Sequence, residues 1–235
     1  MSTTWKTHII RMNSNYLTSP EGYDPHHTKD ILLSSNREYL KTEVFQSTIK
    51  VITVRHPFQR LVSAYRDKFH NGQKIPIPRT KSEKLKFLNF MGPVLASLNL
   101  THRFYDNNLY LTFEEFVKFI IKDGLMSINR STTLSNPHWL PYYRLCHPCH
   151  INYDFIIEMD HAEEEMTWLS RHLNITEISP NLSLNKQPSI EEFSDLMEKY
   201  FNSLPPRLYE RLVSLLSFDF HLFNYVIPQQ GIRTK

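Results

Sequence analysis

Residues 51–69 read VITVRHPFQRLVSAYRDKF, and this stretch divides at Arg55 into a predicted strand and a predicted helix. The β-branched run over residues 47–54 is typical of a strand in the middle of a sheet. Pro57 suits the first turn of a helix. Apolar residues then recur at helical spacing along one side, namely Phe58, Leu61, Val62, Tyr65 and Phe69. The opposite side collects polar residues that we expect to face a ligand or solvent, namely His56, Arg60, Ser63 and Asp67.

The junction between this strand and helix is expected to bind an anion. Ligands of α/β sheets bind beyond the carboxyl ends of the strands, where a helix N-terminus offers unpaired N–H groups and a positive dipole end. Arg55 lies at the junction and Ser63 lies two turns into the helix, so both are placed to hold a phosphate. The alternative is that Arg55 and Arg60 form ordinary surface ion pairs with acids such as Asp67.

The rest of the chain alternates helix and strand signals, which predicts an α/β fold with helices covering a largely parallel sheet. A capping box at residues 112–115 opens a helix that we expect Gly124 to end. A second strand is predicted at 151–157, followed by a helix that Asp160 caps. Further helices are expected at residues 3–15, after a capping box at 189–192, and along the face of Leu208, Leu212, Leu215 and Leu216. We expect a single domain over residues 1–235.

The composition is that of an ordinary globular chain. Of 235 residues, 40% are hydrophobic and 22% are charged, with 27 Lys and Arg against 24 Asp and Glu. This balance excludes a disordered chain, and a net charge of +3 is too small for a general nucleic-acid-binding protein. No window approaches the roughly 18 consecutive apolar residues of a membrane span, and the N-terminus lacks the apolar stretch of a signal peptide.

Residues 55–69 resemble the 3′-phosphate-binding motif of the Golgi carbohydrate sulfotransferases, in the group of the chondroitin 4-O-sulfotransferases and the HNK-1 sulfotransferase. Other blocks of that family occur in the family's order, at residues 112–116, 138–141, 145–149, 153–156 and 219–223. Together the blocks span nearly the whole chain. The resemblance implies a P-loop-like α/β fold and the donor 3′-phosphoadenosine 5′-phosphosulfate (PAPS), with no metal.

The resemblance also assigns residues to the donor. Arg55 and Ser63 are expected to bind the 3′-phosphate, with smaller contributions from His56 and Arg60. The start of the chain, with Thr3 and Thr4, is similar to the end of the family's second loop, which grips the 5′-phosphosulfate. The usual Lys of that loop and the strand before it have no counterpart, so we expect an N-terminally truncated domain with weak or absent turnover. The alternatives are an alternative isoform, or an inactive family member that still binds a nucleotide or a glycan.

An acceptor hydroxyl needs a base, and His138 is the leading candidate because imidazole accepts a proton near neutral pH. The alternatives are a structural His138, or a base among Glu114, Glu115 and Asp154. Some basic residues either border an acceptor cleft or form a solvated surface, namely Lys74, Arg79, Lys81, Lys84 and Lys86. The resemblance implies a glycan acceptor, with N-acetylgalactosamine of chondroitin or dermatan as the expected sugar. A P-loop kinase is disfavoured, because the Gly-x4-Gly-Lys-Ser/Thr motif does not occur.

Cys146 and Cys149 are spaced as in a redox pair, but they precede the predicted strand rather than follow one. A zinc site would need a second pair, which is not evident. We expect a structural disulfide or two buried thiols, and the Golgi resemblance favours the disulfide. That resemblance also implies a type II membrane protein of the Golgi lumen whose anchor is not in this sequence. Four glycosylation sequons agree with this location, at Asn99, Asn129, Asn174 and Asn181.

Overall fold

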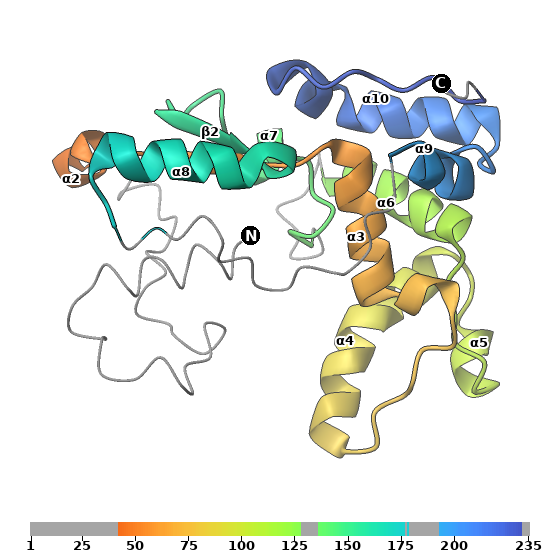
Figure 1. Cartoon of the computed structure of the whole chain (residues 1–235). Coiled ribbons are helices and arrows are strands. Elements are labelled where there is room, and N and C mark those ends of the chain that lie inside the picture. Colours follow the sequence, from red (N-terminus) through yellow and green to blue (C-terminus); the bar gives the residue numbers. More distant parts are fainter. Residues whose placement is uncertain (1–41, 128–135, 177, 179–192, 232–235) are drawn as a thin grey trace. The chain divides into compact units, whose positions relative to one another are not determined.

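The computed structural model describes residues 42–127, 136–176, 178 and 193–231 (Figure 1). Within them the fold is α/β, with many helices and a small parallel sheet. The chain forms two compact units. The first comprises the described parts of Met1–Arg55 and Pro148–Ile190, and the second those of His56–His147 and Glu191–Lys235.

The first unit contains α2 (Glu43–Ser47), β1 (Val51–Val54), β2 (Phe155–Glu158), the 3-10 turn η4 (Met159–His161) and α8 (Ala162–Leu173). The second unit contains α3 (Pro57–Lys68), the 3-10 turn η3 (His70–Gly72), α4 (Lys81–Ser97), α5 (His102–Tyr105), α6 (Phe113–Ser127), α7 (Tyr142–Leu145), α9 (Phe193–Leu196), the π-helical turn η5 (Met197–Phe201) and α10 (Pro206–Leu222).

The first unit is built around two parallel strands. Val51 of β1 lies opposite Phe155 of β2, and the pairing continues to Val54 and Glu158. The side chains of β1 alternate between half-buried and buried, as expected for β-branched residues on a pleated strand. β2 runs through η4 into α8, and its Ile157 packs in a small core with Met166, Leu169 and Ile178. The predicted parallel pairing of strands is therefore confirmed.

Both strands are shorter at their N-terminal ends than the sequence predicts. The strand predicted from Ser47 begins at Val51, because residues 43–47 form α2, whose first turn is capped by the Thr42 hydroxyl. The strand predicted from Ile151 begins at Phe155. β-branched composition marks the strand centre, whereas pairing with the neighbouring strand sets its length.

The predicted capping role of Asp160 is wrong. Asp160 lies inside η4, and His161 is the N-cap residue of α8 without a side-chain cap bond. The helix predicted at residues 3–15 and the capping box at 189–192 lie outside the described residues.

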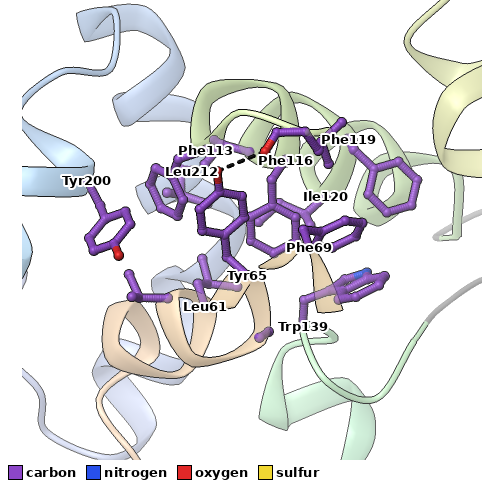
Figure 2. Packing of buried hydrophobic residues seen from close by; sticks show 14 of the residues in the cluster. Leu61, Tyr65, Phe69, Phe113, Phe116, Phe119, Ile120, Trp139, Tyr200 and Leu212 are labelled. Carbon is purple, nitrogen blue, oxygen red and sulfur yellow. Dashed lines mark hydrogen bonds between the residues drawn. The ribbon is translucent and has the colours of Figure 1, made fainter. Parts of the chain in front are cut away.

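The second unit has an aromatic core. The predicted apolar side of α3 is confirmed, since Phe58, Leu61, Val62, Tyr65 and Phe69 are all buried. The ring of Phe58 stacks on Phe201 with centroids 4.1 Å apart. Figure 2 shows the Tyr65 side chain among the rings contributed by α6. Leu212 and Leu216 of α10 are buried in the same cluster, as the amphipathic pattern predicts.

The helix α6 begins as predicted and ends later. Its capping box is formed, with Thr112 N–H donating to Glu115 Oε2 at 2.9 Å and Glu115 N–H donating to Thr112 Oγ1 at 3.2 Å. Gly124 does not end the helix, which continues to Ser127. A Cβ at Gly124 would lie 2.7 Å from a methyl group of Leu215 in α10, so glycine permits this close packing. A helical glycine costs only about 1 kcal/mol relative to alanine, which helix packing outweighs.

No helix within residues 42–127, 136–176 and 193–231 is long and apolar enough to cross a membrane.

Candidate functional site

The first turn of α3, directly after Arg55, is capped by a histidine side chain. Nδ1 of His56 accepts a hydrogen bond from the backbone N–H of Phe58 at 3.2 Å, and Pro57 has no N–H group. His56 is buried, and its ring meets Phe220 and Tyr225 edge to face. This helix N-terminus therefore offers an anion fewer N–H groups than the sequence predicts.

Ser63 lies half-buried on α3, on the same side of the helix as His56 and Arg60. Its hydroxyl forms no hydrogen bond with the rest of the described chain, so the oxygen is available to a ligand. Arg55 ends the first unit, whereas Ser63 belongs to the second. The phosphate site that they are predicted to share therefore stays a prediction, as does the role of Thr3 and Thr4, which lie outside the described residues.

The Arg60 side chain is engaged by residues 136–146, which we call the anchored segment. Its Nη1 donates to the carbonyl of Leu140 at 2.7 Å, and its Nη2 donates to the carbonyl of Pro137 at 2.6 Å. The guanidinium carbon also lies 4.2 Å from the centroid of the Tyr142 ring, a cation–π distance. Part of the helix side predicted to face ligand or solvent is therefore covered by the protein itself.

The anchored segment is also held by α6. Trp139 is buried, and Figure 2 shows it beside Phe69 at the aromatic core. Its indole Nε1 donates to Asp123 Oδ2 at 3.3 Å. Burial raises the pKa of Asp123, although the bond from Trp139 and the nearby Arg144 act against it. Arg144 in turn donates to the carbonyl of Gly124 at 3.2 Å.

Asp219 of α10 supplies the third attachment of the anchored segment. Its fully buried carboxylate accepts from the backbone N–H of Tyr142 at 2.7 Å and from that of Tyr143 at 2.9 Å. Burial raises the pKa of Asp219, while both backbone bonds and the Arg60 cation lower it. Asp219 begins the family block at residues 219–223, but it was not predicted as a site residue. A charged residue in register with Leu212 and Leu216 on an apolar helix side is the signal that reveals it.

His138, which the sequence predicts as a base, is one of the exposed residues of the anchored segment. Its backbone N–H donates to Asn136 Oδ1 at 3.0 Å. Partial desolvation lowers the pKa of His138; Lys68 and Arg60 lower it further, and Asp67 opposes them. A lowered pKa keeps the imidazole neutral at pH 7, the form that accepts a proton.

The alternative bases have structural roles. Arg103 binds both carboxylate oxygens of Glu115, at 2.9 Å and 2.8 Å. Burial raises the pKa of Glu115, but hydrogen bonds from Arg103 and Thr112 outweigh it, so the pKa is lowered overall. Glu114 forms an exposed ion pair with Lys118 at 2.6 Å.

Asp154, the third alternative, accepts from the backbone N–H of Lys50 at 2.7 Å. Lys50 directly precedes β1, and Asp154 directly precedes β2. Because the two strands are parallel, Asp154 lies at their N-terminal ends, whereas Arg55 follows the C-terminal end of β1. The choice of His138 over these three carboxylates stays a prediction.

Cys146 and Cys149 are thiols in the structure, rather than the disulfide that the resemblance favours. Burial raises the pKa of the Cys146 thiol; Arg60 opposes this effect and Asp219 adds to it. In the part of the chain that the structure describes, His, Cys, Asp and Glu side chains form no group of three or more that could hold a metal ion.

Comparison with known proteins adds independent information. Carbohydrate sulfotransferase 10 of Danio rerio is 27% identical over 97% of this chain and 62% of its own length. Carbohydrate sulfotransferase 11 of Rattus norvegicus is 30% identical over 78% of this chain and 48% of its own length. Carbohydrate sulfotransferase 12 of Xenopus laevis is 29% identical over 82% of this chain and 43% of its own length. The chain thus spans about half the length of these curated relatives.

No solved structure matches the chain. A model described as the sulfotransferase family matches residues 1–226, which include the junction after Arg55, the anchored segment and α10. The chain belongs to the sulfotransferase family.

Proposed function

We propose that this protein is a carbohydrate sulfotransferase, which transfers the sulfuryl group of PAPS to a hydroxyl group of a glycan. The observation that carries the proposal is the family match over residues 1–226, supported by relatives that are named carbohydrate sulfotransferases. The donor would bind in a P-loop-like α/β fold, beyond the end of β1.

In this proposal Arg55 and Ser63 hold the 3′-phosphate of the donor. A guanidinium forms charge-assisted hydrogen bonds to phosphate oxygens, and the available hydroxyl of Ser63 adds a neutral one. Thr3 and Thr4 would contribute to the 5′-phosphosulfate site. A direct contact from His56 stays a prediction.

The reaction would break the bond between sulfur and the bridging oxygen of PAPS and form a bond from sulfur to the acceptor oxygen. The acceptor proton passes to the imidazole of His138, and adenosine 3′,5′-bisphosphate leaves with the electron pair of the broken bond. Because such transfer has a loose in-line transition state, as phosphoryl transfer does, positioning and charge stabilisation supply most of the rate.

The proposed acceptor is N-acetylgalactosamine in a chondroitin or dermatan chain, and the proposed location is the Golgi lumen. Exposed basic residues of the loop before α4 and of its first turns would attract such an acidic polysaccharide, namely Lys74, Arg79, Lys81, Lys84 and Lys86.

Sulfate transfer from radiolabelled PAPS to desulfated chondroitin, desulfated dermatan and desulfated heparin tests the proposal. We expect weak labelling, confined to the first two acceptors and lost on Arg55→Ala. Transfer to none of the three, by protein that binds adenosine 3′,5′-bisphosphate, would indicate an inactive nucleotide-binding module instead. Transfer to heparin alone would contradict the proposed acceptor.

A further inference from the structure

Two side chains from different helices form hydrogen bonds with the backbone of the anchored segment. We call these two sets of hydrogen bonds the grips. Arg60 of α3 binds the carbonyls of Pro137 and Leu140, which flank His138 in the sequence. Asp219 of α10 binds the N–H groups that follow, at Tyr142 and Tyr143. The two grips have opposite polarity, because a cation holds carbonyl oxygens and a carboxylate holds N–H groups.

Tyr142 couples these two grips. Its ring lies under the Arg60 guanidinium at 4.2 Å, and its backbone N–H donates to Asp219. The Arg60 cation also lowers the pKa of the Asp219 carboxyl, so the two charges act on each other. Lysine is expected to be a poor replacement for Arg60, because the two carbonyls are bound by two separate nitrogens of a planar guanidinium, whereas all the donors of lysine share one nitrogen.

The two terminal nitrogens of Arg60, Nη1 and Nη2, therefore each donate a hydrogen bond within the protein, at 2.7 Å and 2.6 Å. Binding a donor phosphate through these two nitrogens would compete with bonds to carbonyls that are already made, of which the one to Leu140 is partly buried and the one to Pro137 is exposed. The observed contacts thus argue against a role of Arg60 as a phosphate ligand.

We propose that Arg60 and Asp219 are positioning residues, which hold the anchored segment so that His138 is fixed beside α3, and that Arg60 does not contact the donor. The catalytic consequence rests on the proposed function, in which His138 is the base. Trp139 is buried in the core and holds the segment there by its own packing, so we expect Arg60 and Asp219 to set the orientation of the neighbouring His138.

Hydrogen–deuterium exchange over residues 136–146 tests the grips without requiring activity. Arg60→Gln and Asp219→Asn are expected to speed exchange of this segment about tenfold or more. The matched control is Arg66→Gln, because Arg66 lies on the same helix and also donates to a tyrosine, Tyr200, at 3.0 Å, with its guanidinium near that ring. The control should leave exchange of the anchored segment within about twofold of the parent protein.

Equal exchange in the Arg60→Gln and Arg66→Gln variants would overturn the proposal. If Arg60→Gln does not fold, exchange over residues 136–146 is compared between Asp219→Asn and Arg66→Gln instead. Asp219→Asn keeps one acceptor oxygen and removes the charge. Arg60→Lys is expected to resemble Arg60→Gln, because the fork is lost although the charge remains.

Nucleotide binding separates positioning from donor binding. Arg60→Gln should leave the Kd for adenosine 3′,5′-bisphosphate within about twofold, while kcat for sulfate transfer falls about 10- to 100-fold. A Kd weakened about tenfold with unchanged segment exchange would make Arg60 a donor ligand and overturn the proposal. If the parent protein does not bind the nucleotide, the proposed function fails, while the exchange result still decides whether the grips exist.

Discussion

The phenol hydroxyl of Tyr65 donates a hydrogen bond to the backbone carbonyl of Leu111 at 2.8 Å, inside the aromatic core (Figure 2). This bond ties α3 to the residues that lead into α6. Burial raises the pKa of Tyr65 to about 12, with smaller contributions from Tyr200 and Glu115, so the hydroxyl remains a donor at physiological pH. Gly72 lies against the hydroxyl oxygen of Tyr65. A Cβ at Gly72 would lie 2.6 Å from that oxygen.

Gly72→Ala is expected to destabilise the protein by about 1–3 kcal/mol, because alanine strains a backbone at positive φ and its methyl group displaces the Tyr65 hydroxyl. Gly72 has a φ of +79°. The control is Gly92→Ala in α4, where a Cβ meets no atom within 4 Å. This control should be neutral or stabilising by up to about 1 kcal/mol. Urea unfolding measures both variants, and equal effects would contradict the assigned packing.

Glu115→Gln is expected to lower the free energy of unfolding at pH 7 by about 1–2 kcal/mol, because Arg103 loses its carboxylate partner. The folded state holds the pKa of Glu115 below its ordinary value. Its stabilisation is therefore present above about pH 4.3 and is lost as the pH falls through the lowered pKa.

Urea unfolding at several pH values should show the gap between the parent protein and Glu115→Gln closing in acid. Glu114→Gln is the control, since its exposed pair with Lys118 is expected to contribute less than about 0.5 kcal/mol. A gap that stayed constant with pH would rule out the ion pair as its cause.

The His138 imidazole should titrate below its ordinary pKa of about 6.5. NMR titration, with the signal assigned by His138→Gln, measures this pKa directly. Lys68→Gln should raise it and Asp67→Asn should lower it, because these are the neighbouring charges. Lys118→Gln, a change on α6, should leave it unchanged. A pKa insensitive to Lys68→Gln would contradict the placement of His138 beside α3.

The local features of the chain could be predicted from its sequence. The apolar side of α3, the capping box of α6 and the leucine face of α10 all repeat at helical spacing, and each is formed. Such patterns report burial within one element, which is a property of neighbouring residues. The start of β1 and the end of α6 were misplaced, because strand pairing and packing against Leu215 set these limits.

Tertiary partners could not be predicted in this way. The periodicity places Arg60 on the polar side of α3, but it cannot reveal that the partners are carbonyls some 80 residues later. The same holds for Asp219. The sequence shows a charged residue on an apolar helix side, but only the structure shows that this carboxylate accepts hydrogen bonds from N–H groups of the anchored segment. The role of His138 as a base stays a prediction from the sequence, whereas the contacts that hold its neighbours were found only in the structure.

Expression through a secretory pathway should place N-linked glycans on Asn99 and Asn174. Both sequon residues are exposed, with left-handed φ values of 59° and 52° just after α4 and α8. Asn99→Gln and Asn174→Gln should each remove one glycan, seen as a gel shift that peptide N-glycosidase abolishes. Asn224→Gln is the control, because Asn224 follows α10 with a φ of 54° but lacks a sequon. Unchanged migration of both sequon variants would count against a lumenal location.

The central claim is that Arg55 and Ser63 hold the phosphate on the donor's ribose, and calorimetric titration with adenosine 3′,5′-bisphosphate tests it most directly. We expect Arg55→Ala to weaken binding about 10- to 100-fold and Ser63→Ala about 3- to 10-fold. Arg66→Gln should bind as the parent protein does. The same Kd for the Arg55→Ala, Ser63→Ala and parent proteins, or undetectable binding by the parent, would contradict the account.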